Sequence, residues 1–188
     1  MAAPYTAWET PRELFDHLNS AVGGFAVDAA ADQANRLVSD WYGPGSPLGE
    51  DALEVEEWLS PAWCNPPYGR GLTKWLEKFN QQGQLGVHVV ALLPAYVERV
   101  WWKTRVVDTG ADIIFLTGRV SFVRGDGQPA SSPRDPSALV IFGPSSSGRV
   151  GWLDWRKRPS NVNKEVASDR GEDSQGAGEG SERGTGEG

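Results

Sequence analysis

The sequence predicts a three-layer α/β domain built around a mostly parallel β-sheet. Short apolar runs of strand length alternate with segments whose apolar residues recur at helical spacing. The run Val87–Leu93 is nearly continuous and rich in β-branched residues, which is typical of a central strand in a parallel sheet. A chain of 188 residues can form one such domain with a sizeable core, but not two.

The first helix is predicted to begin at Thr10, which would act as its N-cap. Pro11 would take the first helical position and Glu13 would complete a capping box. We expect this helix to run to about Leu18. A glycine pair then breaks the chain before Phe25–Asp28, a short apolar run that predicts a buried strand ending in a carboxylate.

The middle of the chain, residues 32–59, is punctuated by glycine and proline and is predicted to be mostly loop. Apolar spacing and composition predict the later elements in this order: a strand at Ala62–Cys64, a helix carrying Leu72, Trp75, Leu76 and Phe79, the strand Val87–Leu93, a helix at Val97–Val107, and strands at Ile113–Leu116, Val120–Phe122 and Ala138–Phe142.

The composition changes towards the C-terminal end. From about residue 159 the chain is rich in Ser, Gly and Glu and contains no aromatic residue. Such a segment buries too little apolar surface to offset the entropy of ordering. We therefore expect one domain over residues 1–158 and a disordered acidic tail over residues 159–188.

Charge and composition exclude several classes of protein. The net charge of -7 argues against a protein that coats nucleic acid by charge alone, although a local basic groove remains compatible with it. One cysteine excludes an internal disulfide, and with only two histidines no zinc cluster is expected. The sequence shows neither a signal peptide nor a membrane-spanning run. An intracellular, cytoplasmic protein without metal or membrane attachment is the expectation.

The most specific signal is the tetrapeptide Asn65-Pro66-Pro67-Tyr68 directly after a predicted strand. Ligands of open α/β sheets bind at the carboxyl ends of the strands. The exocyclic amine of a nucleic-acid base is a poor nucleophile, because its lone pair is delocalised into the ring. The amide oxygen of Asn65 and the carbonyl of Pro66 would accept its two hydrogens and free the lone pair, and Tyr68 offers an aromatic face for an extruded base. The alternative is that two prolines and an aromatic residue simply end the strand.

With this motif the chain resembles the phage-type N6-adenine DNA methyltransferases. The resemblance covers most of the body, and its residues are Trp8, Thr10-Pro11, Leu14-Phe15, Phe25–Ala30, Asn35, Asp51, Leu53, Trp58, Trp63–Tyr68, Leu92–Pro94, Trp102, Gly118–Val120, Phe122 and Ser137–Phe142.

The resemblance implies a Rossmann-like methyltransferase that transfers methyl from S-adenosylmethionine to adenine N6 of a flipped-out base in DNA. It implies that Thr10 and Pro11 lie near the methionine end of this cofactor and that the strand ending at Asp28 passes beneath it. One departure is that Asp28-Ala29-Ala30-Ala31 replaces the usual glycine-rich turn. Alanine is small enough for a nucleoside to approach Ala29, but it does not take the positive φ angles open to glycine.

Asp51 is either a ribose ligand or an ordinary loop acid.

Four arginines are candidates for DNA contacts. Arg70 follows the motif and Arg119 begins a predicted strand, where either would reach a phosphate or the target base. Arg124 and Arg134 belong to a connection of residues 123–136 with several glycines and prolines, which we expect to be a mobile loop that engages DNA. For Arg70, plain surface solvation is the alternative.

The tryptophans and the cysteine are mostly expected in the core. Trp75 and Trp101 are predicted to be buried, whereas Trp8 and Trp102 are weaker candidates for lining a base pocket. Cys64 is predicted to be a buried strand residue rather than a nucleophile, because no general base adjoins it.

Two alternatives to DNA adenine methylation stay open at this point. The same tetrapeptide would serve a methyltransferase acting on RNA or on a protein glutamine amide, since these substrates also present a planar amino nitrogen. The alanine-rich turn also motivates a DNA-binding relative that no longer binds the cofactor. The sequence predicts neither the oligomeric state nor a recognition sequence.

Overall fold

The computed structural model describes residues 8–123 and 135–156. The predicted boundary near residue 158 and the predicted disordered tail lie outside these ranges. The elements in chain order are α1 (Arg12–Val22), β1 (Val27–Asp28), β2 (Ala62–Cys64), α2 (Leu72–Gln84), β3 (Val89–Pro94), α3 (Val100–Arg105), the 3-10 turn η1 (Val107–Thr109), β4 (Asp112–Leu116), β5 (Ser137–Phe142) and β6 (Val150–Leu153).

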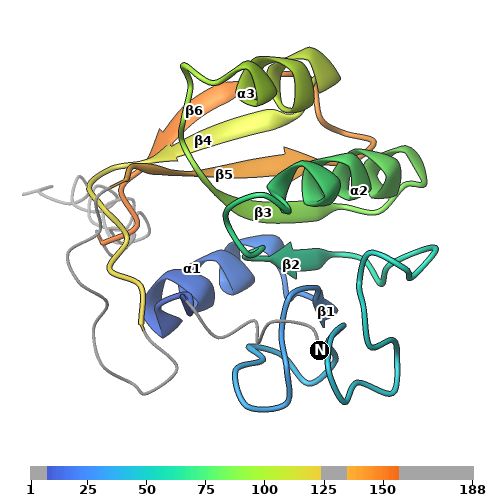
Figure 1. Cartoon of the computed structure of the whole chain (residues 1–188). Coiled ribbons are helices and arrows are strands. Elements are labelled where there is room, and N and C mark those ends of the chain that lie inside the picture. The colour runs from blue at the N-terminus through green and yellow to red at the C-terminus, as the bar shows by residue number, and fades with distance from the viewer. Residues whose placement is uncertain (1–7, 124–134, 157–188) are drawn as a thin grey trace, which may run out of the picture. The chain divides into compact units, whose positions relative to one another are not determined.

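The six strands form one mixed sheet in the order β1-β2-β3-β5-β4-β6 (Figure 1). β1, β2 and β3 pair in parallel, and so do β4 and β6. β5 lies between β3 and β4 and runs antiparallel to both. The sheet is therefore mixed: five strands run in one direction, in partial agreement with the predicted mostly parallel sheet, and β5 opposes them. An apolar run such as Ser137–Phe142 does not indicate whether its strand pairs in parallel or antiparallel, because both of its faces are buried in either orientation.

Two hydrophobic clusters cover the two faces of the sheet. On one face, Leu14, Phe15 and Leu18 of α1 pack with Trp63, Val90 and Leu92 of the strands. On the other face lie α2 and α3 (Figure 1). Alternate residues of β2 and β3 point to opposite faces, as the pleat requires. The result is the helix–sheet–helix arrangement that the sequence predicted.

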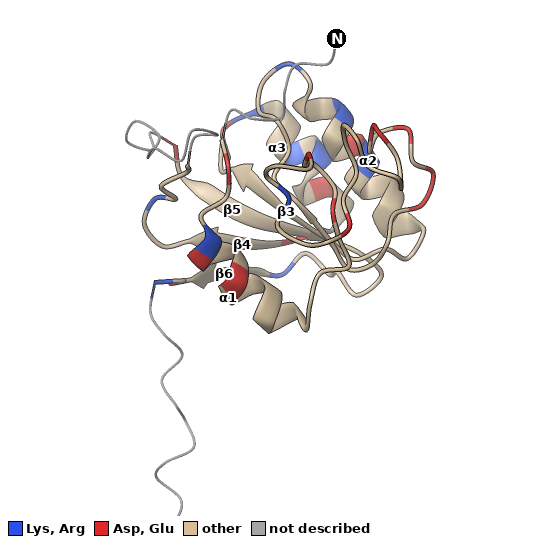
Figure 2. Ribbon diagram, turned by 90° about the horizontal axis from the view of Figure 1, so that it is seen from below, with Lys and Arg blue, Asp and Glu red and all other residues tan. Residues whose placement is uncertain are grey.

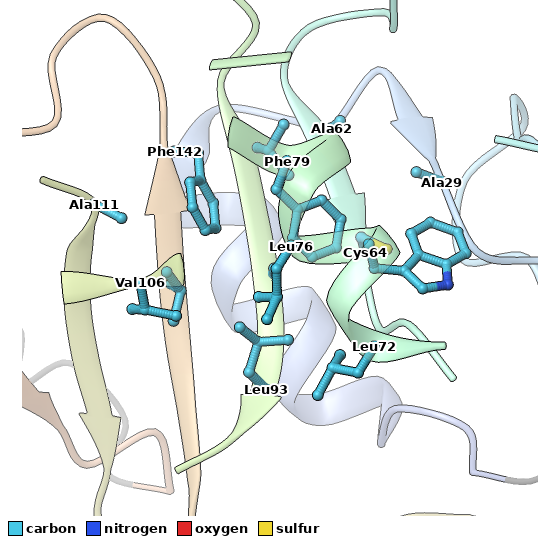
Figure 3. Close-up of a cluster of buried hydrophobic side chains, with 14 of the residues drawn as sticks. Ala29, Ala62, Cys64, Leu72, Leu76, Phe79, Leu93, Val106, Ala111 and Phe142 are labelled. Atoms are coloured by element: carbon cyan, nitrogen blue, oxygen red, sulfur yellow. The ribbon is translucent and has the colours of Figure 1, made fainter. Parts of the chain in front are cut away.

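The core beneath α2 combines aliphatic and aromatic side chains. Figure 3 shows Leu76 and Phe79 of α2 lying between Phe142 of β5 and Cys64 of β2. The ring centroids of Phe79 and Phe142 are 5.7 Å apart. The spacing of apolar residues in Leu72–Phe79 predicted this helix, and the buried residues of α2 confirm it.

A buried amide ties the long loop before β2 to α2. Gln82 is fully buried; its Oε1 accepts from the Trp58 N–H over 2.7 Å and its Nε2 donates to the Glu56 carbonyl over 2.7 Å. The region 32–59 contains no helix or strand, as predicted. Its course therefore depends on such contacts with helices and on its own turns.

The predicted capping box at the start of α1 is wrong. Pro11 occupies the cap position, and no side chain caps the helix. The Thr10 Oγ1 is buried and has no hydrogen-bond partner among the described residues. The helix also runs further than predicted, to Val22, and ends at Gly23, whose φ of 87° explains the glycine there.

The later part of the chain differs from the prediction in three respects. Residues 120–122 form no strand; nearby, Val123 makes a single bridge to Glu9. The helix expected over Val97–Val107 shortens to Val100–Arg105, followed by η1. Strand β6 was not predicted, because its four residues follow a stretch rich in serine and glycine and two of its side chains face solvent.

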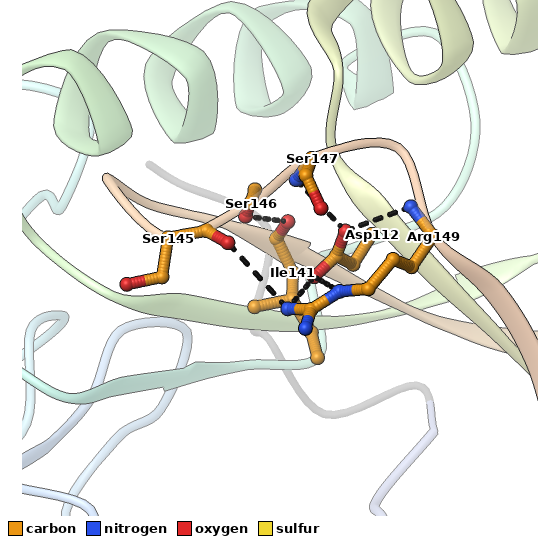
Figure 4. Close-up of polar contacts among 6 residues, drawn as sticks. All are labelled: Asp112, Ile141, Ser145, Ser146, Ser147 and Arg149. Atoms are coloured by element: carbon orange, nitrogen blue, oxygen red, sulfur yellow. Dashed lines mark hydrogen bonds and ion pairs between the residues drawn. The ribbon is translucent and has the colours of Figure 1, made fainter.

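A buried carboxylate fastens the connection between β5 and β6 to the start of β4 (Figure 4). Asp112 accepts from the backbone N–H groups of Ser147 and Arg149, and from the Arg149 guanidinium over 3.0 Å and 2.6 Å. The hydrogen bonds from Arg149 hold the pKa of Asp112 at about 2. This network positions edge strand β6.

The parallel strands β1, β2 and β3 end at the same edge of the sheet. Asp28 pairs in register with Trp63, and Cys64 pairs with Ala91. The end of β1 at Asp28 and the residue after β2, Asn65, therefore meet at this edge. None of the helices in the described ranges is both long and apolar enough to cross a membrane.

Candidate active site

Asn65 follows β2 directly and is half-buried. Its side-chain Nδ2 donates to the backbone carbonyl of Trp8 over 2.9 Å. A carbonyl only accepts, so the amide nitrogen must face Trp8 and Oδ1 is the atom left to accept from a ligand. The amide is thus oriented by a segment far away in sequence.

The two prolines that follow shape the backbone beside this amide. Pro66 is buried and Pro67 is exposed. Within the described part of the chain, the Pro66 carbonyl receives no hydrogen bond. A second acceptor therefore lies one residue from the Asn65 amide, and the proline after it holds Pro66 in an extended conformation.

Tyr68 is anchored by its hydroxyl while 36% of its surface stays exposed. The hydroxyl donates to the Leu92 carbonyl of β3 over 3.1 Å. Its burial, more than the neighbouring Cys64 and Tyr96, raises the pKa of Tyr68 well above its usual range. The ring meets Phe122 edge-on, with centroids 6.3 Å apart. Tyr68 is therefore a fixed aromatic surface three residues after Asn65 rather than an acid or base.

Asp28 is a buried carboxyl at the end of β1. Its Oδ2 accepts from the Leu37 N–H over 3.2 Å and its Oδ1 from the Ala30 N–H over 3.4 Å. Burial outweighs these two bonds and raises the pKa of Asp28 to about 7. No cation pairs with it among the described side chains, so this group would gain from a ligand that brings donors or positive charge.

A small pocket joins Asp28 to Asn65. Its volume is about 20 Å³. Its walls include Trp8, Glu9, Thr10, Asp28, Asn35 and Asn65. Thr10 is 6% exposed and its Oγ1 is the unpartnered hydroxyl described above. The pocket thus combines one unsatisfied hydroxyl, a buried carboxyl and the side-chain amide of Asn65.

The segment Trp8–Thr10 is held in place on two sides. Glu9 exchanges two backbone hydrogen bonds with Val123, of 2.7 Å and 3.0 Å. On the other side α1 begins, and its Phe15 packs edge-on against Trp63 of β2 at 5.7 Å. The Trp8 carbonyl is therefore a preorganised partner for Asn65.

Comparison with known proteins identifies the family. Residues 3–173 match the family profile described as DNA N-6-adenine-methyltransferase (Dam). The chain belongs to the Dam family.

The chain is also similar to a DNA N-6-adenine-methyltransferase of Escherichia phage T1, with 25% identity over 165 residues. The alignment covers 76% of this chain and 65% of the phage protein. The Dam-family chain thus spans less than two thirds of the length of this relative.

The structure brings together only some of the residues predicted to bind the cofactor of a Dam-family protein. Thr10, Asp28 and Asn65 line one pocket. Ala29 packs in the core, and its N–H donates to the Trp63 carbonyl over 2.8 Å, so its neighbours Asp28 and Ala30 line the pocket instead. Pro11 caps α1. Asp51 is exposed in a loop, where its carboxylate accepts from the Leu53 N–H over 2.9 Å.

The predicted DNA-binding arginines lie in different places. Arg70 is exposed in the turn before α2, close in sequence to Tyr68. Arg119 is exposed in the loop after β4, and its carbonyl accepts from the Arg156 guanidinium. Arg124 and Arg134 lie outside the described residues. Figure 2 shows Lys and Arg interspersed with Asp and Glu over the described part of the chain, without a continuous basic stripe in that view.

The structure also places the other residues that the sequence singled out. Trp102 is 3% exposed and stacks on Phe115, so the suggestion that it lines a base pocket is wrong. Trp8 lines the small pocket beside Asn65, and its contact with a target base stays a prediction. Burial raises the pKa of the Cys64 thiol well above its usual value, which disfavours the nucleophilic thiolate. Within residues 8–123 and 135–156, no group of three or more His, Cys, Asp or Glu side chains is arranged to hold a metal ion.

Sequence reasoning missed two contributors to the site. The Trp8 carbonyl orients Asn65, and Glu9 lines the pocket. Every residue has a backbone carbonyl, so the sequence does not indicate which one contacts Asn65. Glu9 stands next to Thr10 in the chain, and this adjacency to a predicted cofactor residue was the one available signal.

The pocket chemistry fits S-adenosylmethionine. This cofactor carries a sulfonium, an ammonium and hydroxyl groups, and the pocket presents an orphaned hydroxyl and unneutralised carboxyl groups.

Proposed function

We propose that this Dam-family chain is a methyltransferase that transfers methyl from S-adenosylmethionine to the N6 amino group of adenine in DNA. The observation that carries the proposal is the orientation of Asn65. Its amide nitrogen is bound by the Trp8 carbonyl over 2.9 Å, so its Oδ1 faces the site as an acceptor.

This arrangement suits a planar amino nitrogen as the group to be methylated. Oδ1 of Asn65 and the carbonyl of Pro66 would each accept one hydrogen of the amine. The nitrogen then becomes more pyramidal and its lone pair turns towards the methyl donor. Preorganised acceptors of this kind contribute about 10²- to 10³-fold to the rate each.

The cofactor supplies an electrophilic methyl group on a sulfonium. The fold supports its placement, because five strands run in one direction, β5 alone opposes them, and Asp28 and Asn65 lie at the carboxyl ends of parallel strands. This edge is where a Rossmann-like sheet binds its ligand. Asp28 and Thr10 would hold the donor next to Asn65.

The target base would lie on Tyr68 after leaving the DNA stack. The ring is partly exposed, and its hydroxyl is tethered to the Leu92 carbonyl, so the aromatic face keeps its position. Stacking on such a face is worth about 1–3 kcal/mol per base. Arg70 and Arg119 remain the proposed phosphate contacts from the described ranges, and the roles of Arg124 and Arg134 stay predictions.

The decisive experiment uses radiolabelled S-adenosylmethionine with DNA, RNA and protein fractions as acceptors. We expect label in DNA as N6-methyladenine, and an Asn65→Ala variant should incorporate about 10²- to 10³-fold less. Asn80→Ala, a change on α2 away from the pocket, is the matched control and should keep wild-type turnover. Label in RNA or in glutamine side chains would replace the proposed substrate.

The alanine-rich turn after Asp28 favours one second candidate, a DNA-binding relative that has lost its cofactor. Calorimetry separates the two. Heat of binding with S-adenosylmethionine supports the enzyme, whereas its absence at millimolar ligand, together with retained DNA binding, supports the inactive relative.

A further inference from the structure

Strand β6 forms one edge of the sheet, and in the described part of the chain only β4 pairs with it (Figure 1). The carbonyls of Arg149 and Leu153 accept from N–H groups in and just after β4, over 2.8 Å and 2.9 Å, so these carbonyls point towards β4. Backbone groups alternate in direction along a strand. The N–H and carbonyl groups of Val150 and Trp152 therefore point away from β4, along the open edge of the sheet.

The side chains of this edge are apolar and exposed. Trp152 is 73% exposed and Val150 is 55% exposed. Both lie on the α3 face of the sheet, since the ring centroids of Trp152 and Phe115 are 5.7 Å apart and Phe115 stacks on Trp102 of α3. Proteins usually protect an edge strand with lysine, proline or a bulge, but Val150–Leu153 contains neither lysine nor proline. Outward backbone groups beside exposed apolar side chains are the features of a surface that takes an additional strand.

The charges at the two ends of β6 favour a second copy of this chain as the additional strand. Arg149 precedes β6 and Asp154 follows it. The Arg149 side chain is 71% exposed although it pairs with Asp112. When two copies pair antiparallel, the positive end of each strand lies beside the negative end of the other. A parallel pairing would bring like charges together, which destabilises a sheet.

The symmetry of such a pair limits its register. In a twofold dimer, each contact between two residues occurs twice, once from each copy. Centring the pair on Gly151 places Val150 of each copy opposite Trp152 of the other. Both residues present outward N–H and carbonyl groups, so each pair is joined by backbone hydrogen bonds, and each Trp152 ring packs on the opposite Val150. The two Gly151 residues then face each other as the close pair that exchanges no hydrogen bond.

We propose that β6 of this chain pairs antiparallel with β6 of a second copy, centred on Gly151, and forms a dimer with one continuous sheet. Val150 and Trp152 are the apolar contact residues of this interface. Because β6 has only four residues, the interface is small and the dimer should dissociate in the micromolar range or above. Strands β3, β5 and β4 lie between β6 and β2, so the interface is remote from Asn65.

Sedimentation of the full chain between about 1 µM and about 1 mM measures the association. We expect the wild type to pass from monomer to dimer over this range. Trp152→Lys should raise the dissociation constant at least about tenfold, because it removes the apolar contact and puts a charge on the edge. The matched control is Leu48→Lys, which changes a 42% exposed leucine in the loop before β2 and should leave association unchanged. Circular dichroism checks that each variant is folded.

Cysteine cross-linking tests the register. In the proposed dimer the two Gly151 Cα atoms lie about 4.5 Å apart, within the range that a disulfide spans. A Cβ at Gly151 meets no described atom within 4 Å beyond its chain neighbours, so the substitution fits the fold. Gly151→Cys should therefore form a disulfide dimer on oxidation, whereas Leu153→Cys, which would face Arg149 of the second copy, should not. The native Cys64 is buried and should not cross-link.

A wild type that stays monomeric up to about 1 mM would overturn the proposal. The same result is expected if the edge instead takes residues 157–188 of its own chain. Association that Trp152→Lys leaves unchanged, or that Leu48→Lys weakens equally, would put the interface on another surface and overturn the proposal as well. Equal cross-linking through Gly151→Cys and Leu153→Cys would contradict the antiparallel register centred on Gly151.

Discussion

The amide nitrogen of Asn65 donates to the carbonyl of Trp8, a residue 57 positions earlier in the chain, over 2.9 Å. This bond decides which atom of the side chain faces a substrate. It also connects the end of β2 to the segment before α1, which is itself paired with Val123.

Asn65→Asp should lower turnover by about 10²-fold. Aspartate keeps an acceptor of the same size but loses the donor, so one carboxylate oxygen would face the Trp8 carbonyl and be repelled. Steady-state methylation at saturating S-adenosylmethionine gives the turnover. Wild-type turnover in this variant would mean that the Trp8 bond does not orient the catalytic group.

Two substitutions at Tyr68 separate anchoring from stacking. Tyr68→Phe loses only the bond to the Leu92 carbonyl and should cost about 1 kcal/mol of stability, with the KM for DNA nearly unchanged. Tyr68→Ala removes the aromatic face and should weaken capture of the base by about 1–3 kcal/mol. The fluorescence of 2-aminopurine at the target position reports base extrusion. If both variants reduce it equally, the ring does not act by stacking.

Asp28→Asn should change how stability depends on pH. The carboxyl has an ordinary pKa of 3.8 when exposed and about 7 when folded, so between these values the folded state holds a proton that the unfolded state has lost. Wild-type stability therefore falls as the pH rises through this window. The free energy of unfolding of the variant, relative to wild type, should rise from about pH 4 to about pH 7 and then level off. Urea unfolding at several pH values measures it, and a constant difference would contradict the buried, unpaired carboxyl.

Asp112→Asn should destabilise the fold by roughly 1–3 kcal/mol at neutral pH, because the hydrogen bonds to Arg149 and Ser147 weaken. The folded pKa of about 2 lies below the ordinary 3.8, so this contribution is present above pH 3.8 and is lost as the pH falls towards 2. The gap between variant and wild type should close over that range in thermal unfolding. Asp108→Asn is the control, since its pair with Lys103 is largely exposed and contributes less than about 1 kcal/mol. Equal losses in both variants would contradict the special role of Asp112.

The position of the Asn65–Tyr68 motif and much of the fold could be predicted because their causes are local. Apolar runs at the periods of strands and helices predicted β2, α2, β3 and β5, and the burial of these elements confirms it. The tetrapeptide Asn65–Tyr68 follows β2 as expected, because two prolines in succession end a strand wherever they occur.

Tertiary structure alone decided the rest, because the interactions involved join distant residues. The direction of β5 follows from its pairing with β3 and β4, and β6 is positioned by the Asp112–Arg149 contact across 37 residues. The sequence around Thr10 predicts a helix cap. In the structure its hydroxyl is buried, without a hydrogen-bond partner among the described residues, in the pocket that Asp28 and Asn65 share. Local spacing predicted the strand and helix between which Asn65–Tyr68 lies, and the chemical role of these residues stays a prediction. The Trp8 carbonyl and Glu9 joined them only through folding, since hydrogen bonds between distant backbone and side-chain atoms depend on packing and not on periodicity.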